Sequence, residues 1–134
     1  MRYVIAYCAI AASLVVSASS RAGFTAPATT LRADVAEWSI VPSAGVVPAG
    51  RVRIEVRNLG TTAHEIVLVR TSSFGARLRL RGTHAVVPSA LGTVVVKPGA
   101  RTSFVVSLKA GSYLLLDNLP WHYWKGTSAA FSVR

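Results

Sequence analysis

The residues best suited to chemistry gather in one stretch near the C-terminus. From Asp117 to Thr127 the sequence reads DNLPWHYWKGT, which holds a carboxylate, an imidazole, two Trp, a Tyr and a Lys. Apolar runs at 113–116 and 129–133 flank it and have the composition of strands. A loop of this kind between two strands indicates a binding site, since Trp and Tyr favour interfaces and His is a common ligand.

Candidates for catalysis are few. The chain has five acids, and they form no pair suited to general acid–base work: Asp34, Glu37, Glu55, Glu65 and Asp117. A Gly-x-Ser-x-Gly motif and a phosphate-binding glycine loop are both missing from the sequence. We therefore expect a binding protein and not an enzyme.

The elements that must position this loop are short strands. Apolar Val52, Ile54 and Val56 alternate with charged residues over 51–57, which is the clearest strand pattern of the chain. Further strands are expected at 33–41, 64–70, 77–81, 93–97, 102–108, 113–116 and 129–133. Frequent Pro and Gly turns and the lack of a helical period predict an all-β fold, an antiparallel Greek-key β-sandwich.

This arrangement resembles the cupredoxins, the blue-copper β-sandwich family. In that family a Cys ends the penultimate strand, a Pro-Gly-His-Tyr-like segment supplies a His, and a Gly-Met pair supplies a weak axial ligand. The resemblance implies that Asp117 stands at the Cys position, His122 at the His position and Thr127 at the Met position. His64, in the segment Thr61–Glu65, would be the upstream His. The resemblance covers roughly the last hundred residues, the usual size of such a sandwich.

The replaced positions change the chemistry that the resemblance implies. Blue copper needs a thiolate with two His and a weak axial Met, whereas Asp117 offers a hard oxygen. His64, Asp117 and His122 suit Cu(II) or Zn(II), with Thr127 as a weak oxygen donor, and fast electron transfer is disfavoured. Two other interpretations stay open: Asp117 pairs with the backbone or a His without any metal, or the protein is a copper electron carrier despite the replacements.

Individual residues of the site have structural interpretations too. His64 shares a strand face with Ile66 and Leu68, so it is either a core-edge His or a ligand. His84 matches no ligand position and is expected to be structural. Because the loop is expected outside the core, Asp117→Ala should leave the sandwich folded.

The N-terminal residues 1–22 predict a secretory signal peptide. Met1-Arg2 precedes an apolar run from Tyr3 to Val16, and small residues follow, with cleavage expected after Ala18 or Ala22. A Pro- and Thr-containing linker is expected at 23–31, and the domain at 32–134. Cys8 is the one cysteine of the chain, so the mature domain has none. We expect a secreted or periplasmic protein without a membrane span after cleavage.

Charge points to acidic partners. Lys and Arg number 15 against 5 acids, giving a net charge of +10 at pH 7. An acidic protein or an anionic envelope surface fits this balance, whereas an exported protein is not expected to meet nucleic acid. Two arginine-bearing segments, 51–57 and 77–81, are candidate docking faces. In the metal-free alternative, an adhesion or interaction module would use these faces and an aromatic patch consisting of Trp121, Tyr123, Trp124 and Lys125.

Overall fold

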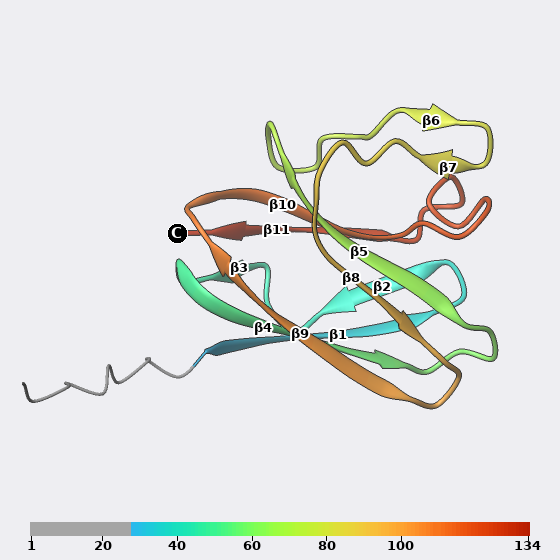
Figure 1. The fold of residues 1–134 in the computed structure, drawn as a ribbon, viewed down its shortest axis with the longest axis horizontal. Helices are drawn as coiled ribbons and strands as arrows, with labels where there is room; N and C mark the ends of the chain where they lie inside the picture. The colour runs from blue at the N-terminus through green and yellow to red at the C-terminus, as the bar shows by residue number, and fades with distance from the viewer. Residues whose placement is uncertain (1–27) are drawn as a thin grey trace, which may run out of the picture.

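The computed structural model describes residues 28–134, which form two facing β-sheets and no helix (Figure 1). The first sheet has the order β2-β1-β4-β9. Its strands are β1 (Thr29–Ala36), β2 (Ser39–Pro42), β4 (Gly50–Asn58) and β9 (Arg101–Leu108). The expected signal peptide, residues 1–22, lies outside the described residues, as does the linker up to residue 27.

The second sheet is larger and carries the C-terminal hairpin. Its order is β3-β11-β10-β5-β8. The strands are β3 (Val46–Val47), β5 (His64–Thr71), β8 (Ala90–Val96), β10 (Gly111–Asp117) and β11 (Ser128–Val133). A separate two-stranded hairpin, β6 (Leu80–Arg81) with β7 (His84–Ala85), stands above the outer face of this sheet (Figure 1).

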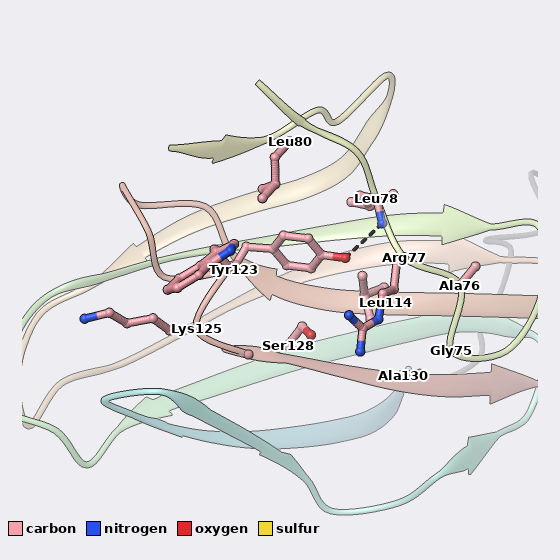
Figure 2. Close-up of a pocket in the computed structure, with 12 residues that line it drawn as sticks. Gly75, Ala76, Arg77, Leu78, Leu80, Leu114, Tyr123, Lys125, Ser128 and Ala130 are labelled. Carbon is pink, nitrogen blue, oxygen red and sulfur yellow. Dashed lines mark hydrogen bonds between the residues drawn. The ribbon is translucent and has the colours of Figure 1, made fainter. Parts of the chain in front are cut away.

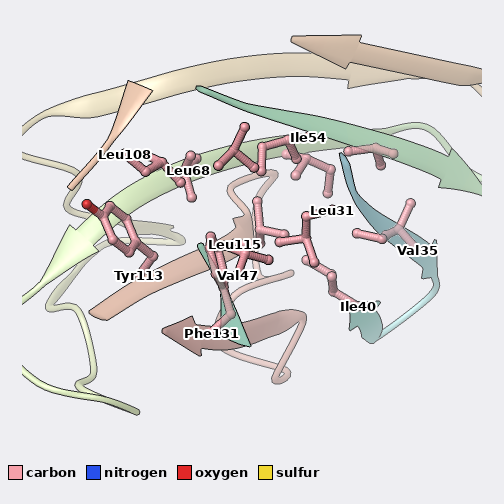
Figure 3. Close-up of a cluster of buried hydrophobic side chains, with 14 of the residues drawn as sticks. Leu31, Val35, Ile40, Val47, Ile54, Leu68, Leu108, Tyr113, Leu115 and Phe131 are labelled. Carbon is pink, nitrogen blue, oxygen red and sulfur yellow. The ribbon is translucent and has the colours of Figure 1, made fainter. Parts of the chain in front are cut away.

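The main core lies between the two sheets. Alternation along β4 turns Val52, Ile54 and Val56 inward, where they are at most 1% exposed. They meet buried residues of the second sheet, among them Leu115 and Phe131 (Figure 3). Complete burial of side chains of this size stabilises the fold by about 1.5–3 kcal/mol each.

A second, smaller apolar cluster lies on the other face of the second sheet. Val67, Val69, Leu114 and Leu116 are buried there and contact Ala85 of β7. Residues 72–89 thus cover the outer face of β5 and β10, which explains why both strands are nearly continuous apolar runs.

Three connections meet at one end of the sandwich, at the right of Figure 1. They are the β1–β2 turn at 37–38, the β4–β5 loop at 59–63 and the β10–β11 loop at 118–127. The site residues identified from the sequence lie in these connections or beside them, which confirms that His64 and the aromatic loop share one end.

The all-β sandwich is confirmed, but its pairing is not antiparallel throughout. β1 pairs parallel with β4, and β3 pairs parallel with β11. Thr29 pairs with Val52, so the first sheet begins within the segment expected to be linker. Parallel neighbours need a connection that crosses over between them. The chain allows this because β2 and β3 lie between β1 and β4, and β4 to β10 lie between β3 and β11.

Two expected strands were wrong in their extent. The strand expected over 33–41 is two antiparallel strands joined at Glu37 and Trp38, with Ala36 opposite Ser39. Trp38 has a φ of 65°, a left-handed conformation that a sequence pattern does not reveal in a Trp. Only Leu80–Arg81 of the expected 77–81 strand is a strand. The Leu78 N–H donates to the Tyr123 hydroxyl oxygen and not to a neighbouring strand.

No helix within residues 28–134 has the length and apolar character needed to cross a membrane.

Candidate metal centre

Asp117 is the centre of the site. It is the last residue of β10, and its side chain is completely buried. Its backbone N–H donates to the Thr127 carbonyl at 3.0 Å, which closes the loop 118–126 at its base. The strand end and this closing bond fix the carboxylate at the edge of the core.

Both imidazoles meet one oxygen of this carboxylate. His64 Nδ1 lies 2.6 Å from Asp117 Oδ2, and His122 Nδ1 lies 2.5 Å from the same atom. The other oxygen, Oδ1, accepts the backbone N–H groups of Glu65 and Leu119, each at 3.1 Å. With the imidazole protons on Nδ1, four hydrogen bonds saturate the acceptor capacity of the carboxylate.

The two His differ in exposure. His64 is completely buried at the start of β5, whereas the His122 side chain is 15% exposed. Their rings lie edge to face with centroids 5.5 Å apart. His122 is therefore the member of the pair closest to solvent, and His64 anchors the group to the core.

Thr127 lies beside the group and keeps a polar atom unused. Its backbone N–H donates to the His122 carbonyl at 3.1 Å, and its side chain is completely buried. Within residues 28–134 its Oγ1 has no hydrogen-bond partner, and the same is true of His64 Nε2. Buried polar atoms are rarely left without a partner, so these two atoms call for an explanation.

Trp38 covers the site from the first sheet. Its ring lies edge to face against His122 at 5.1 Å between centroids, and the Lys125 ammonium stands 3.9 Å from the Trp38 ring centroid. A cation over an indole face at this distance is attracted by the ring quadrupole. Trp38 remains 44% exposed, so it shields one side of His122 without closing the site.

Glu37 holds this covering turn in place. Its Oε1 accepts the N–H of Thr61 at 2.5 Å and that of Thr62 at 3.0 Å. The N–H of Glu37 itself, then the N–H and hydroxyl of Thr61 and the N–H of Thr62, lower the pKa of Glu37 from 4.5 to about 2. Hydrogen bonds to the charged form cause this direction of shift.

The expected aromatic patch is divided by the fold. Trp121 and Trp124 are 51% and 63% exposed and lie edge to face at 6.0 Å. Tyr123 instead turns inward, where its hydroxyl oxygen accepts the Leu78 N–H at 2.8 Å. The surface patch therefore consists of Trp121, Trp124 and Lys125 together with Trp38.

Neither the protein-family models nor the curated proteins contain a match to this chain. Among solved structures, reduced auracyanin from Roseiflexus castenholzii is 19% identical, with a TM-score of 0.60 over 80% of this chain and 98% of that one. Auracyanin B is 19% identical with a TM-score of 0.60, over 82% and 91% of the two chains. Rusticyanin from Thiobacillus ferrooxidans is 15% identical with a TM-score of 0.57, over 81% and 79%.

The described domain has a cupredoxin-like fold.

Within this cupredoxin-like domain, the four residues assigned by resemblance lie together. One ligand atom each from His64, Asp117 and His122 lies within 4.8 Å of the others. Thr127 adjoins both His122 and Asp117 through its backbone bonds. His84, expected to be structural, is exposed on β7, where its Nδ1 lies 3.0 Å from the Thr83 hydroxyl, outside this group.

The three side chains could hold a metal ion after their ligand atoms rearrange. Ligand atoms about 2.0 Å from a tetrahedral metal stand ~3.3 Å apart, so Asp117 Oδ2 must move away from both Nδ1 atoms. Both Nδ1 atoms must also give up their protons. The Thr127 Oγ1, buried and without a hydrogen-bond partner, would be the candidate for a fourth, weak oxygen donor.

Sequence reasoning missed the residues that support the group. Glu37 and Trp38 were assigned to a continuous strand. In the structure Glu37 binds the loop before His64, and Trp38 covers His122. Asn118 was not singled out, although its Oδ1 accepts the Ala85 N–H at 2.8 Å and fixes the loop to β7. The Pro-free dipeptide Glu37-Trp38 carried no turn signal, and the partner of Asn118 is distant in sequence.

Proposed function

We propose that this protein is an exported, cupredoxin-like metal-binding domain that holds Cu(II) or Zn(II). The observation that carries the proposal is the convergence of His64, Asp117 and His122 ligand atoms within 4.8 Å at one end of the sandwich. Two imidazoles and a carboxylate suit both cations. Rusticyanin, one of the structural neighbours, is a copper protein, which supports copper as the first metal to test.

His64, Asp117 and His122 would have different roles in the site. His64 and Asp117 are buried and fixed by the core, so they would form the rigid part of the site. His122 sits on the loop near solvent and would complete the site when the cation enters. Bound copper would supply Lewis acidity or a Cu(II)/Cu(I) couple, but an oxygen donor at position 117 favours Cu(II) and opposes rapid electron transfer.

Titration calorimetry of the purified protein with Zn(II) and with Cu(II) tests the proposal. We expect one site per chain, and His122→Gln should weaken binding at least about tenfold, since a direct ligand is lost. His84→Gln is the matched control, because it removes an exposed imidazole outside the group. Equal affinity of the two variants, or no binding by the parent protein, would reject the site.

A metal-free role is the second candidate, and the four hydrogen bonds on Asp117 favour it. They satisfy the buried carboxylate without a cation. The group would then be a structural hydrogen-bond network that joins β5, β10 and the loop. The exposed Trp121, Trp124 and Lys125 would then bind an acidic protein. The same calorimetric titrations separate the two functions, because a purely structural hydrogen-bond network would bind no metal.

Export rests on the sequence of residues 1–22 and is part of the proposal. N-terminal sequencing of protein recovered from outside the cytoplasm should give a chain beginning at residue 19 or 23. A chain that retains residue 1 would argue against a cleaved signal.

A further inference from the structure

A cavity of about 520 Å³ lies on the outer face of the second sheet (Figure 2), and neither His of the candidate metal centre lines it. Leu114 of β10 and Ala130 of β11 form its apolar floor. One wall comes from residues 75–78 and Leu80, and the other comes from Tyr123 and Trp124 of the aromatic loop. Small-molecule sites commonly have this size.

Hydrogen bonds fix the two walls against each other. The Leu78 N–H donates to the Tyr123 hydroxyl oxygen at 2.8 Å, as the dashed line of Figure 2 shows. The Trp121 N–H donates to the Thr83 carbonyl at 2.8 Å, and Asn118 holds Ala85. The cavity is therefore preformed, because the 72–89 segment and the aromatic loop are joined at three points.

The polar groups of the cavity are donors. Arg77 lines it, and its side chain reaches past Leu114 toward Ala130 in Figure 2. Tyr123 accepts one bond and keeps its own O–H proton, and the Ser128 hydroxyl lies on the same side of the sheet. Lys125 points away from Arg77 (Figure 2). Its ammonium stands over the Trp38 ring instead.

The charge of the cavity is uncompensated. None of the ion pairs within residues 28–134 includes Arg77, and none of the residues lining the cavity is an acid. Arg79 and Arg81 are exposed on the same segment and add to its positive potential. A guanidinium without an anionic partner beside an apolar floor is complementary to a carboxylate that carries an apolar body.

We propose that this cavity binds a small organic anion, an aromatic or branched aliphatic carboxylate, whose head group meets Arg77 and whose body lies on Leu114 and Ala130 against Trp124. The inference goes beyond metal binding, since none of the metal-site residues lines the cavity.

Calorimetry with 1-naphthoate and its neutral analogue 1-naphthamide tests this proposal, in the presence of a chelator so that the metal site plays no part. The naphthoate should bind one per chain, and the amide should bind at least about tenfold more weakly, because it lacks the charge that Arg77 recognises. Arg77→Gln should weaken naphthoate binding by a similar factor, whereas Arg79→Gln, on the same segment but outside the lining, should change it less than about threefold. Trp124→Phe should reduce the ligand-induced change in tryptophan fluorescence.

Three results would overturn the proposal. They are equal binding of acid and amide, equal effects of Arg77→Gln and Arg79→Gln, and no naphthoate binding up to about 1 mM. Because both Arg residues are exposed, neither variant is expected to unfold the protein, and circular dichroism of each checks this.

Discussion

The carboxylate of Glu37 accepts the backbone N–H of Thr61 at 2.5 Å, and this bond joins the turn that carries Trp38 to the loop that precedes His64. Two segments that are more than twenty residues apart thereby become one support for the site. The consequence is a link between an acidic side chain at the surface and the position of the ring that covers His122.

Glu37 gives the protein a pH-dependent stability with a defined sign. Its pKa in the folded protein is about 2, below its ordinary value of 4.5. A depressed pKa contributes stability above the unfolded value, and the contribution is lost as pH falls through the folded value. Glu37→Gln should therefore flatten the loss of stability between about pH 4.5 and 2, as measured by urea midpoints at each pH.

Gly60 provides an independent test of the same contact. A Cβ at residue 60 would lie 2.6 Å from Glu37 Oε2, so Gly60→Ala should displace the carboxylate. The loss of stability between about pH 4.5 and 2 should then become smaller, as for Glu37→Gln. Gly45→Ala is the control, since a Cβ there has no atom within 4 Å. If stability depends on pH in the same way in the parent protein, Glu37→Gln and Gly60→Ala, the contact of Glu37 with the Thr61 and Thr62 N–H groups does not stabilise the fold.

Gly92 should be intolerant of any side chain. A Cβ at this position of β8 would lie 2.2 Å from the Phe104 ring of β9, and the ring packs against the main core. Displacing it should cost about 1–3 kcal/mol of unfolding free energy. Gly45→Ala should stay within about 0.5 kcal/mol. Phe104→Leu should recover part of the loss in a Gly92→Ala background, and additivity of the two changes would contradict the contact.

The strand pattern of this chain was predictable where burial alternates. Val52, Ile54 and Val56 give β4 directly, and the position of His64 at the start of β5 follows from the apolar face it shares with Ile66 and Leu68. The grouping of His64 with Asp117 and His122 could be inferred from the resemblance. The roles of Glu37, Asn118 and Tyr123 could not, because each depends on a partner more than twenty residues away that no local pattern identifies. The parallel strand pairs and the cavity beside Arg77 could not be predicted either, because both are formed by residues that are distant in sequence.

Asp117→Ala should destabilise the domain strongly, contrary to the expectation from sequence. The loop is not outside the core at this residue, since the carboxylate is fully buried and takes four hydrogen bonds. Removing it leaves several buried donors unpaired at about 1–3 kcal/mol each, a large part of the ~5–15 kcal/mol stability of a domain. Urea unfolding should show a loss of at least ~3 kcal/mol or no folded state.

Asp117→Asn is the informative companion variant. Its amide oxygen can still accept the Glu65 and Leu119 N–H groups, and its NH₂ can donate to both Nδ1 atoms if the imidazole protons move to Nε2. For His64 this places an N–H where no acceptor lies within the described residues. The loss should therefore be about 1–3 kcal/mol, smaller than for Ala. Equal losses for Ala and Asn would mean that the hydrogen bonds do not carry the effect.

Copper spectroscopy tests whether residue 117 stands where a thiolate would bind. With Cys8→Ser as background the chain has no thiol, so added Cu(II) should give no intense blue thiolate absorption. Asp117→Cys with Thr127→Met in the same background places a thiolate between the two Nδ1 atoms and a thioether beside them, and copper should then produce the intense band. Adding His122→Gln should abolish it. An intense band before residue 117 is changed, or none after it, would show that the carboxylate does not occupy the thiolate position.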